Sequence, residues 1–205
     1  PWRSGGDADA PHAPPHKTTT KRPMTAHSSS LSLVADIGGT NTRVALASGA
    51  EVHGDSIRRF RTADHGGIAS VIDAFLGATG IGPDGIGGVC VAAAGPVRAG
   101  VAQMTNLDWR IDRDVLARAL TADRSAVLND LQAQGHAIGH IAADDLLTIV
   151  GPARHGRHET TLVIGVGTGF NACPVHHVGD QRVIPPSEAG HVALPSSVPG
   201  LGAVL

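Results

Sequence analysis

The stretch over residues 33–46 constrains the fold of this chain more than any other part of its sequence. Its letters, LVADIGGTNTRVAL, form two apolar runs separated by a polar turn that contains paired glycines. This pattern predicts a β-hairpin. Because Gly38 and Gly39 have no Cβ atom, backbone N–H groups in such a turn can approach an anion such as a phosphate. A tight hairpin that binds nothing is the alternative.

The hairpin supplies a set of candidate ligand-binding residues. Thr40 and Thr42 offer hydroxyl donors, and Asp36, at the end of the first strand, can orient a hydrated Mg²⁺ through water. The sequence lacks the Gly-Lys-Ser/Thr of a P-loop, and the turn runs into a strand instead of the helix that a dinucleotide fingerprint needs. The candidate phosphate-binding residues of this turn are Asp36, Ile37, Gly38, Gly39, Thr40 and Asn41.

Composition excludes two classes of partner. The formal net charge is −2 and aromatic residues make up 2% of the chain, with no tyrosine, so we expect no nucleic-acid partner. No segment approaches the run of about 18 apolar residues that a membrane span requires, so we expect no membrane association. Cys90 and Cys173 each lie in an apolar segment, which favours buried reduced thiols and a cytoplasmic protein.

The chain divides into a polar leader and an α/β part. Residues 1–30 are rich in Pro, Ser, Thr, Gly and His, so we expect a disordered leader, with the natural start at Met24. Apolar spacing then predicts alternating strands and helices. Strands are expected at 31–36, 42–47, 51–60, 86–94, 101–106, 126–128, 146–150, 161–166 and 172–178, and helices at 68–76, at 113–120 behind the cap Asp112, and at 131–141.

A second glycine-rich turn follows the strand predicted at 161–166. The residues Gly167, Thr168 and Gly169 repeat the order of strand, Gly-Thr turn and strand seen in the hairpin. A single glycine turn is weak evidence for a ligand site, but the repetition makes coincidence less plausible. Two such loops can hold one polyphosphate from opposite sides.

Asn129 and Asp130 are the strongest candidates for chemistry. They lie where an apolar strand gives way to a helix, and the carboxyl ends of strands face the ligand crevice in open α/β sheets. An aspartate there can accept a proton from an attacking hydroxyl, and the amide beside it can hydrogen-bond another hydroxyl. The alternative is a helix N-cap, and the two roles are compatible.

Two further polar groups suit a ligand rich in hydroxyls. Glu188 and His191, three residues apart in a segment bounded by proline and glycine, can hydrogen-bond neighbouring hydroxyls, because a carboxylate accepts and an imidazole donates or accepts. An exposed loop is the alternative. Thr105 and Asn106 end a predicted strand and offer further polar contacts, with a plain turn as the alternative.

Together these motifs resemble those of bacterial glucokinases, members of the hexokinase/actin-like superfamily, over about residues 31–195. The resemblance implies an α/β, actin-like ATPase (ribonuclease H-like) fold with two lobes. Residues 31–140 would form the small N-terminal lobe, and 141–205 would begin the larger one. The matching patches are ADIGGTNTR at 35–43, AGPV at 94–97, MTN at 104–106, LND at 128–130, GVGTG at 165–169 and EAGH at 188–191.

The resemblance also implies a function and roles for the candidate residues. The function would be ATP-dependent phosphorylation of the 6-hydroxyl of glucose with Mg²⁺, the first step of glycolysis, in a cytoplasmic protein that forms a homodimer at full length. Asp130 would be the general base, with Thr105, Asn106, Asn129, Glu188 and His191 on the sugar and the two glycine turns on the ATP phosphates. A kinase for another hexose, or a non-catalytic sugar-sensing or truncated relative, stays open.

The sequence departs from the glucokinase pattern in two places. Phe170-Asn171 stands where the family usually has Leu-Gly, and asparagine tolerates a left-handed backbone better than most residues. The chain also ends at Leu205, where the family continues. We therefore expect the second lobe to be incomplete at its C-terminus and part of its apolar surface to lie open.

Overall fold

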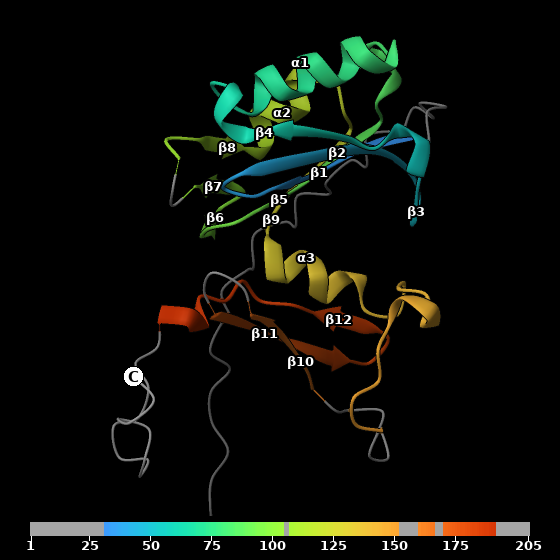
Figure 1. Ribbon diagram of the computed structural model, residues 1–205, viewed down its shortest axis with the longest axis vertical. Coiled ribbons are helices and arrows are strands. Elements are labelled where there is room, and N and C mark those ends of the chain that lie inside the picture. Colours follow the sequence, from blue (N-terminus) through green and yellow to red (C-terminus); the bar gives the residue numbers. More distant parts are fainter. Residues whose placement is uncertain (1–30, 105–106, 152–159, 167–169, 192–205) are drawn as a thin grey trace, which may run out of the picture.

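The computed structural model describes residues 31–104, 107–151, 160–166 and 170–191. Its main body is a six-stranded sheet with the order β3-β2-β1-β5-β9, in which β4 also pairs with β2 (Figure 1). The strands of this sheet are β1 (Leu31–Ile37), β2 (Asn41–Ser48), β3 (Glu51–Val52), β4 (Arg58–Arg61), β5 (Gly88–Ala93) and β9 (Arg124–Asn129).

The predicted hairpin is confirmed, and it forms one half of the sheet. β1 and β2 are antiparallel in a register that pairs Ile37 with Thr42, while β5 is parallel to β1 and β9 is parallel to β5. Side chains on β1 alternate, so that Leu33, Ala35 and Ile37 are buried and Asp36 is exposed. The hairpin turn and the carboxyl ends of β5 and β9 therefore lie at the same edge of the sheet.

Two helices cover one face of this sheet (Figure 1). Helix α1 (Ile68–Thr79) buries Val71, Ile72 and Phe75 in a core shared with β1, β2 and β5. As the glycine spacing predicts, it ends at Gly80, which has a left-handed φ of 70°. Helix α2 (Arg113–Ala119) is capped by Asp112, whose carboxylate accepts from two backbone N–H groups. Those hydrogen bonds, chiefly the one from Asp114, lower the pKa of Asp112.

A small sheet lies beside the carboxyl ends of β5 and β9. It contains β6 (Val97–Arg98), β7 (Val101–Gln103) and β8 (Arg110–Asp112), joined in antiparallel fashion. Trp109 is buried here, and its carbonyl accepts a hydrogen bond from the Met104 N–H. This packing holds Met104 near the edge of the main sheet where the hairpin turn lies.

The second body is a three-stranded antiparallel sheet that packs on helix α3 (Asp130–Ala137). Its strands are β10 (Thr161–Val166), β11 (Phe170–Val178) and β12 (Gln181–Val183). The shared core consists of Leu131 from α3 with Cys173, Val175 and Ile184. Figure 1 shows α3 between this sheet and the uncovered face of the main sheet. Because β9 continues directly into α3, the two bodies are joined at Asn129 and Asp130.

Three expectations about secondary structure are wrong. Residues 51–60 form β3, the short 3₁₀ turn η1 (Gly54–Ser56) and β4 instead of one strand, because the Ser56 hydroxyl accepts from the Leu46 N–H and donates to the His53 carbonyl. The helix after Asp130 ends at Ala137, and Gly139 follows with a left-handed φ of 86°. Residues 146–150 form no strand, because no strand of the described residues pairs with them, and their apolar side chains are exposed.

The remaining 3₁₀ turns are η2 (Thr62–Asp64), η3 (Pro83–Gly85), η4 (Ala143–Asp145) and η5 (Ala189–His191). None of the helices in the described residues is long and apolar enough to cross a membrane. The lobe boundary expected at 140/141 stays a prediction, and the packing of Leu131 with the second sheet offers Asn129–Asp130 as an earlier alternative. The expected leader, residues 1–30, lies outside the described residues.

Candidate functional site

The hairpin turn is closed tightly by its own backbone. The Gly38 N–H donates to the Asn41 carbonyl at 2.9 Å, and a Cβ atom on Gly38 would lie 3.2 Å from the same oxygen. A side chain at this position would therefore push the two strands apart. The absence of a side chain at Gly38 keeps the turn compact, as a phosphate-approaching backbone requires.

Thr62, which the sequence analysis missed, anchors this turn. Its side chain is fully buried, its N–H donates to the Thr40 carbonyl at 3.0 Å, and its hydroxyl donates to the Gly38 carbonyl at 3.0 Å. Its Oγ1 also lies 3.1 Å from the Oγ1 of Thr42, which must be the donor because the Thr62 proton is already used. The expectation that Thr42 offers its hydroxyl to a ligand is therefore wrong, because strand alternation buries that side chain.

The other hairpin residues differ in what they expose. Ile37 points into the core, so its side chain cannot contact a ligand, and its carbonyl already accepts from the Ala94 N–H at 3.1 Å. Asn41 Oδ1 accepts from Arg59 Nε at 3.0 Å. Asp36 lies 3.1 Å from Arg43, and both side chains are more than half exposed, so this ion pair adds little stability and its carboxylate stays accessible to a metal or a ligand.

Asn129 is the buried polar residue at the junction of β9 and α3. Its Oδ1 accepts from the Leu131 N–H at 3.0 Å, which caps α3, and its Nδ2 donates to the Gly95 carbonyl at 3.1 Å. The N-cap alternative is thus correct in structural terms. The same two bonds fix the orientation of the amide at the cavity described below.

Asp130 is the first residue of α3 and is half-buried. Its Oδ1 accepts from the Leu131 N–H at 2.8 Å. A carboxylate is favoured at a helix N-terminus because the backbone N–H groups there carry partial positive charge. The bond to Leu131 holds the carboxylate at the position where β9 delivers it.

A cavity of about 160 Å³ brings several of the predicted residues together. Gly39 comes from the hairpin turn, Asn129 and Asp130 from the β9–α3 junction, and Glu188 from the segment after β12. These segments are far apart in sequence, so only the tertiary fold makes them neighbours. The full lining is Gly39, Ala94, Gly95, Met104, Asn129, Asp130, Asn171 and Glu188.

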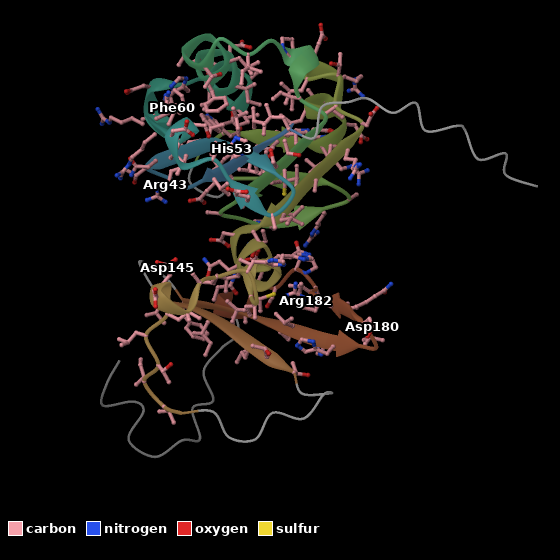
Figure 2. The ribbon with its side chains drawn as sticks, turned by 90° about the vertical axis from the view of Figure 1, so that its right-hand side faces the viewer. Arg43, His53, Phe60, Asp145, Asp180 and Arg182 are labelled. Atoms are coloured by element: carbon pink, nitrogen blue, oxygen red, sulfur yellow. The ribbon has the colours of Figure 1, made fainter. Side chains whose placement is uncertain are left out.

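A second cavity, of about 690 Å³, lies between α3 and the face of the main sheet that α1 leaves uncovered. Asp36 and Asp130 both line it, together with Arg43 and mostly apolar side chains. Figure 2 labels Arg43 on the main body, on the side that faces α3. Two carboxylates at one cavity suit Mg²⁺, which usually takes one or two protein carboxylates plus water and phosphate oxygens. Within the described residues no group of three or more His, Cys, Asp or Glu gathers as a metal cage.

The remaining predicted site residues fall where the structure is not described. Thr105 and Asn106, and the second glycine turn with Gly167, Thr168 and Gly169, lie outside the described residues. His191 closes the 3₁₀ turn η5, but its side chain is not described. Their roles therefore stay predictions.

The two cysteines take no part in either cavity. Both are free thiols, Cys173 is buried and Cys90 is partly buried, as the sequence predicts. Burial raises the pKa of both thiols, which keeps them protonated and unreactive at neutral pH.

Asn171 is a polar cavity residue that the sequence analysis does not assign to the site. It stands at the start of β11, where the family usually has glycine, so in sequence terms it is a departure from the pattern. Its presence in the lining depends on the pairing of β10 with β11 and on the path of the chain after β12. No local pattern indicates that placement.

Comparisons with known proteins identify relatives of this chain. The sequence matches the glucokinase family model over residues 33–200. A glucokinase from Pseudomonas paraeruginosa is 35% identical over 82% of this chain, and one from Caulobacter vibrioides is 36% identical over the same share. The chain spans about half the length of these relatives, 49% and 50%.

Solved structures show the same α/β fold. Glucokinase from an Antarctic psychrotroph superposes with a TM-score of 0.69 at 26% identity, covering 83% of this chain and 53% of that one. Glucokinase from Balamuthia mandrillaris, solved in complex with glucose, gives a TM-score of 0.60 at 25% identity, covering 84% and 51%. The family match and the sequence identity together show that this chain belongs to the glucokinase family.

Proposed function

We propose that the protein transfers the terminal phosphoryl group of ATP to the 6-hydroxyl of glucose. One observation carries the proposal: a single cavity joins the backbone of the hairpin turn at Gly39 to Asp130, Asn129 and Glu188. A phosphate-approaching turn, a candidate base and hydroxyl-binding groups at one cavity are what phosphoryl transfer to a sugar needs. The names of the relatives and the glucose complex of the Balamuthia protein support this assignment.

The sugar would lie against Asn129, Asp130 and Glu188. Glu188 accepts hydrogen bonds from hydroxyls, and the Asn129 amide, fixed by the cap of α3 and by Gly95, offers its remaining N–H. Thr105, Asn106 and His191 would add further contacts. A polyol needs such partners because a buried hydroxyl without a hydrogen bond is costly.

The triphosphate would lie along the hairpin turn, with the backbone N–H groups of Gly39 and Thr40 pointing at it, because the Gly38 N–H already donates to Asn41. Gly167, Thr168 and Gly169 would lie on its other side. The residues present fit Mg²⁺, because Asp36 and Asp130 line one cavity. Asp36 would hold the ion through water, and the ion would neutralise negative charge on the phosphates.

In the reaction, Asp130 would accept the proton of the 6-hydroxyl. The oxygen of that hydroxyl would form a bond to the γ-phosphorus. The bond from that phosphorus to the β-phosphate oxygen breaks, and ADP leaves with the electron pair. The hydrogen bond from Leu131 to Oδ1 keeps the carboxylate in place during this transfer. Positioning supplies most of the catalysis in such reactions.

We also propose an architecture, a cellular location and an oligomeric state for the protein. The architecture would be the two-lobed actin-like (ribonuclease H-like) one, with a small lobe over residues 31–140 and a larger lobe that begins at 141. The protein would be a cytoplasmic homodimer that starts glycolysis. The direct passage of β9 into α3, and the packing of Leu131 with the second sheet, favour a joint at Asn129–Asp130 over the one at 140/141.

A coupled ADP-release assay over a panel of hexoses tests this function. We expect turnover with glucose and ATP, and we expect Asp130→Asn to reduce kcat by at least a hundredfold while the affinity for glucose changes only a few-fold. Asp180→Asn is the matched control, because Asp180 lies in the exposed turn between β11 and β12 (Figure 2). Equal losses of binding and turnover in Asp130→Asn would contradict its role as base, and turnover with another hexose alone would replace glucose as the substrate.

A further inference from the structure

Asn171 makes a hydrogen bond that joins two elements of the site. Its Nδ2 donates to the carbonyl of Ser187 at 3.0 Å, and its Oδ1 accepts from the N–H of Ala172 at 2.9 Å. Asn171 belongs to β11, whereas Ser187 lies after β12. The amide therefore ties the start of one strand to the segment that carries Glu188.

The same segment lies directly on the start of β11. A Cβ atom built on Gly190 would overlap the carbonyl of Phe170, so only glycine lets the backbone of η5 approach this closely. The residues on both sides of Glu188 thus rest on Phe170 and Asn171. The path of the Glu188 backbone depends on this contact and on the bond from Asn171.

We propose that Asn171 is a positioning residue for the sugar site, which acts by holding the Ser187–Glu188 backbone so that Glu188 lines the cavity with Asn129 and Asp130. The inference rests on the proposed function, in which Glu188 binds the sugar. The bond from Asn171 ends on Ser187, the residue directly before Glu188, so Asn171 can act on Glu188 through the backbone.

The bond to Ser187 needs a donor at position 171. An aspartate has nearly the same shape but, when ionised, it only accepts, so it would place a carboxylate against the Ser187 carbonyl. Alanine would remove the bond without adding charge. Both substitutions should release the segment that carries Glu188.

The test measures the Kd and KM for glucose and, separately, the KM for ATP in the purified protein. We expect Asn171→Ala and Asn171→Asp to raise the Kd for glucose, measured by calorimetry, and the KM for glucose about five- to tenfold, with the KM for ATP changed less than about twofold. Thr160→Val is the matched control, because it removes an exposed hydrogen bond between Thr160, just before β10, and His176 of β11. This control should change none of the three constants.

A double-mutant cycle with Glu188→Gln separates positioning from direct contact. If Asn171 acts through Glu188, Asn171→Ala should change the Kd for glucose less than about twofold once Glu188 is replaced. The same five- to tenfold increase in the Kd for glucose with and without Glu188→Gln would overturn the proposal in favour of direct sugar binding by Asn171. Equal increases in both KM values with a lower melting temperature would overturn it in favour of a general structural role.

The outcomes also separate this inference from the proposed function. If the unsubstituted protein binds glucose but Asn171→Ala binds it equally well, only the inference is contradicted. If the unsubstituted protein binds no glucose, the proposed function is contradicted, and the inference with it.

Discussion

Two buried threonines hold the hairpin that carries the candidate phosphate-binding backbone. Thr62 donates to the Gly38 carbonyl and receives the proton of Thr42, and both side chains have no exposed surface. A buried carbonyl that loses its donor costs more than the bond itself contributed, because water cannot replace the partner. The conformation of the turn thus depends on a residue in a different element.

We expect Thr62→Val to lower the free energy of unfolding by about 1–3 kcal/mol, because it keeps the shape of the side chain but removes the donor to Gly38. Urea denaturation measures this change. Thr161→Val on the exposed edge of β10 is the control and should stay within about 0.5 kcal/mol of the unsubstituted protein. Equal stability of both variants would show that the Gly38 carbonyl does not depend on Thr62.

Among the elements, α3 is held on the second sheet by contacts at both of its ends. Gln132 Nε2 donates to the Ile184 carbonyl at 2.7 Å near its start, and Arg182 donates to the carbonyl of Ile138 at its end. Figure 2 shows Arg182 on the second sheet beside α3. Because Asp130 begins this helix, any shift of α3 on the sheet also moves the candidate base.

Gly135 lies where α3 packs closely on the second sheet. A Cβ atom there would lie 2.9 Å from Ile184 Cγ2 and 3.1 Å from Val175 Cγ2. Alanine favours a helix by about 1 kcal/mol over glycine, but overpacking a core costs about 1–3 kcal/mol. We therefore expect Gly135→Ala to destabilise the protein by about 1 kcal/mol in thermal or chemical denaturation.

Gly77 in α1 is the matched control for that substitution. It is exposed, and nothing lies within 4 Å of a Cβ atom built on it. Gly77→Ala should therefore stabilise the protein by about 0.5–1 kcal/mol. The two alanine substitutions are expected to act with opposite sign, and the same sign for both would contradict the packing argument.

His136 on α3 provides a prediction about pH. Partial burial and, second, the positive charge of Arg182 lower the pKa of this imidazole. The unfolded chain then binds more protons than the native protein in the range just below the ordinary pKa of about 6.5, so His136 makes stability fall as the pH drops through that range. We expect Arg182→Gln to raise the pKa of His136 in an NMR titration. An unchanged pKa would assign the whole effect to burial.

On the scale of the whole molecule, the two bodies differ in how much apolar surface they bury. The core of the main body extends over α1, α2 and the strands β1, β2, β5, β7, β8 and β9, whereas the core beneath α3 is small. Leu162, Ile164 and Val166 of β10 point away from α3 and are 55%, 53% and 82% exposed. The sequence predicted open apolar surface in this part of the chain, and exposed apolar faces of this kind favour association.

We expect the 205-residue chain to bind a hydrophobic dye such as ANS and to self-associate as its concentration rises. Replacing Leu162 and Ile164 together by threonine should reduce both, measured by fluorescence and by light scattering. Threonine keeps the strand propensity, and neither Leu162 nor Ile164 lines either of the two cavities. Val115→Thr, an exposed position on α2, should change neither property.

Local patterns in the sequence predicted much of the fold. The hairpin at 33–46, the helix that ends at Gly80, the cap at Asp112 and the strand that delivers Asn129–Asp130 are all confirmed. Each depends on neighbouring residues, through side-chain period, glycine conformation or capping, so no knowledge of the fold was needed. The resemblance of the motifs to those of glucokinases added the candidate roles.

Expectations failed where distant residues decide the structure. The Ser56 hydroxyl, bonded to Leu46, breaks the strand expected at 51–60, and the apolar run at 146–150 has no neighbouring strand to pair with. Thr62 and Asn171 were missed because their partners, Gly38 and Ser187, are far along the chain. No periodicity encodes such pairs.

The sequence by itself determined which local elements form and which residue types stand at their ends, because backbone conformation and side-chain period act over a few residues. Only the tertiary structure decided that Gly39, Asp130, Asn171 and Glu188 line one cavity. The physical reason is that this placement depends on the pairing of β1 with β5 and β9 and on the packing of α3 against the second sheet. These contacts join segments whose separation along the chain leaves no local trace.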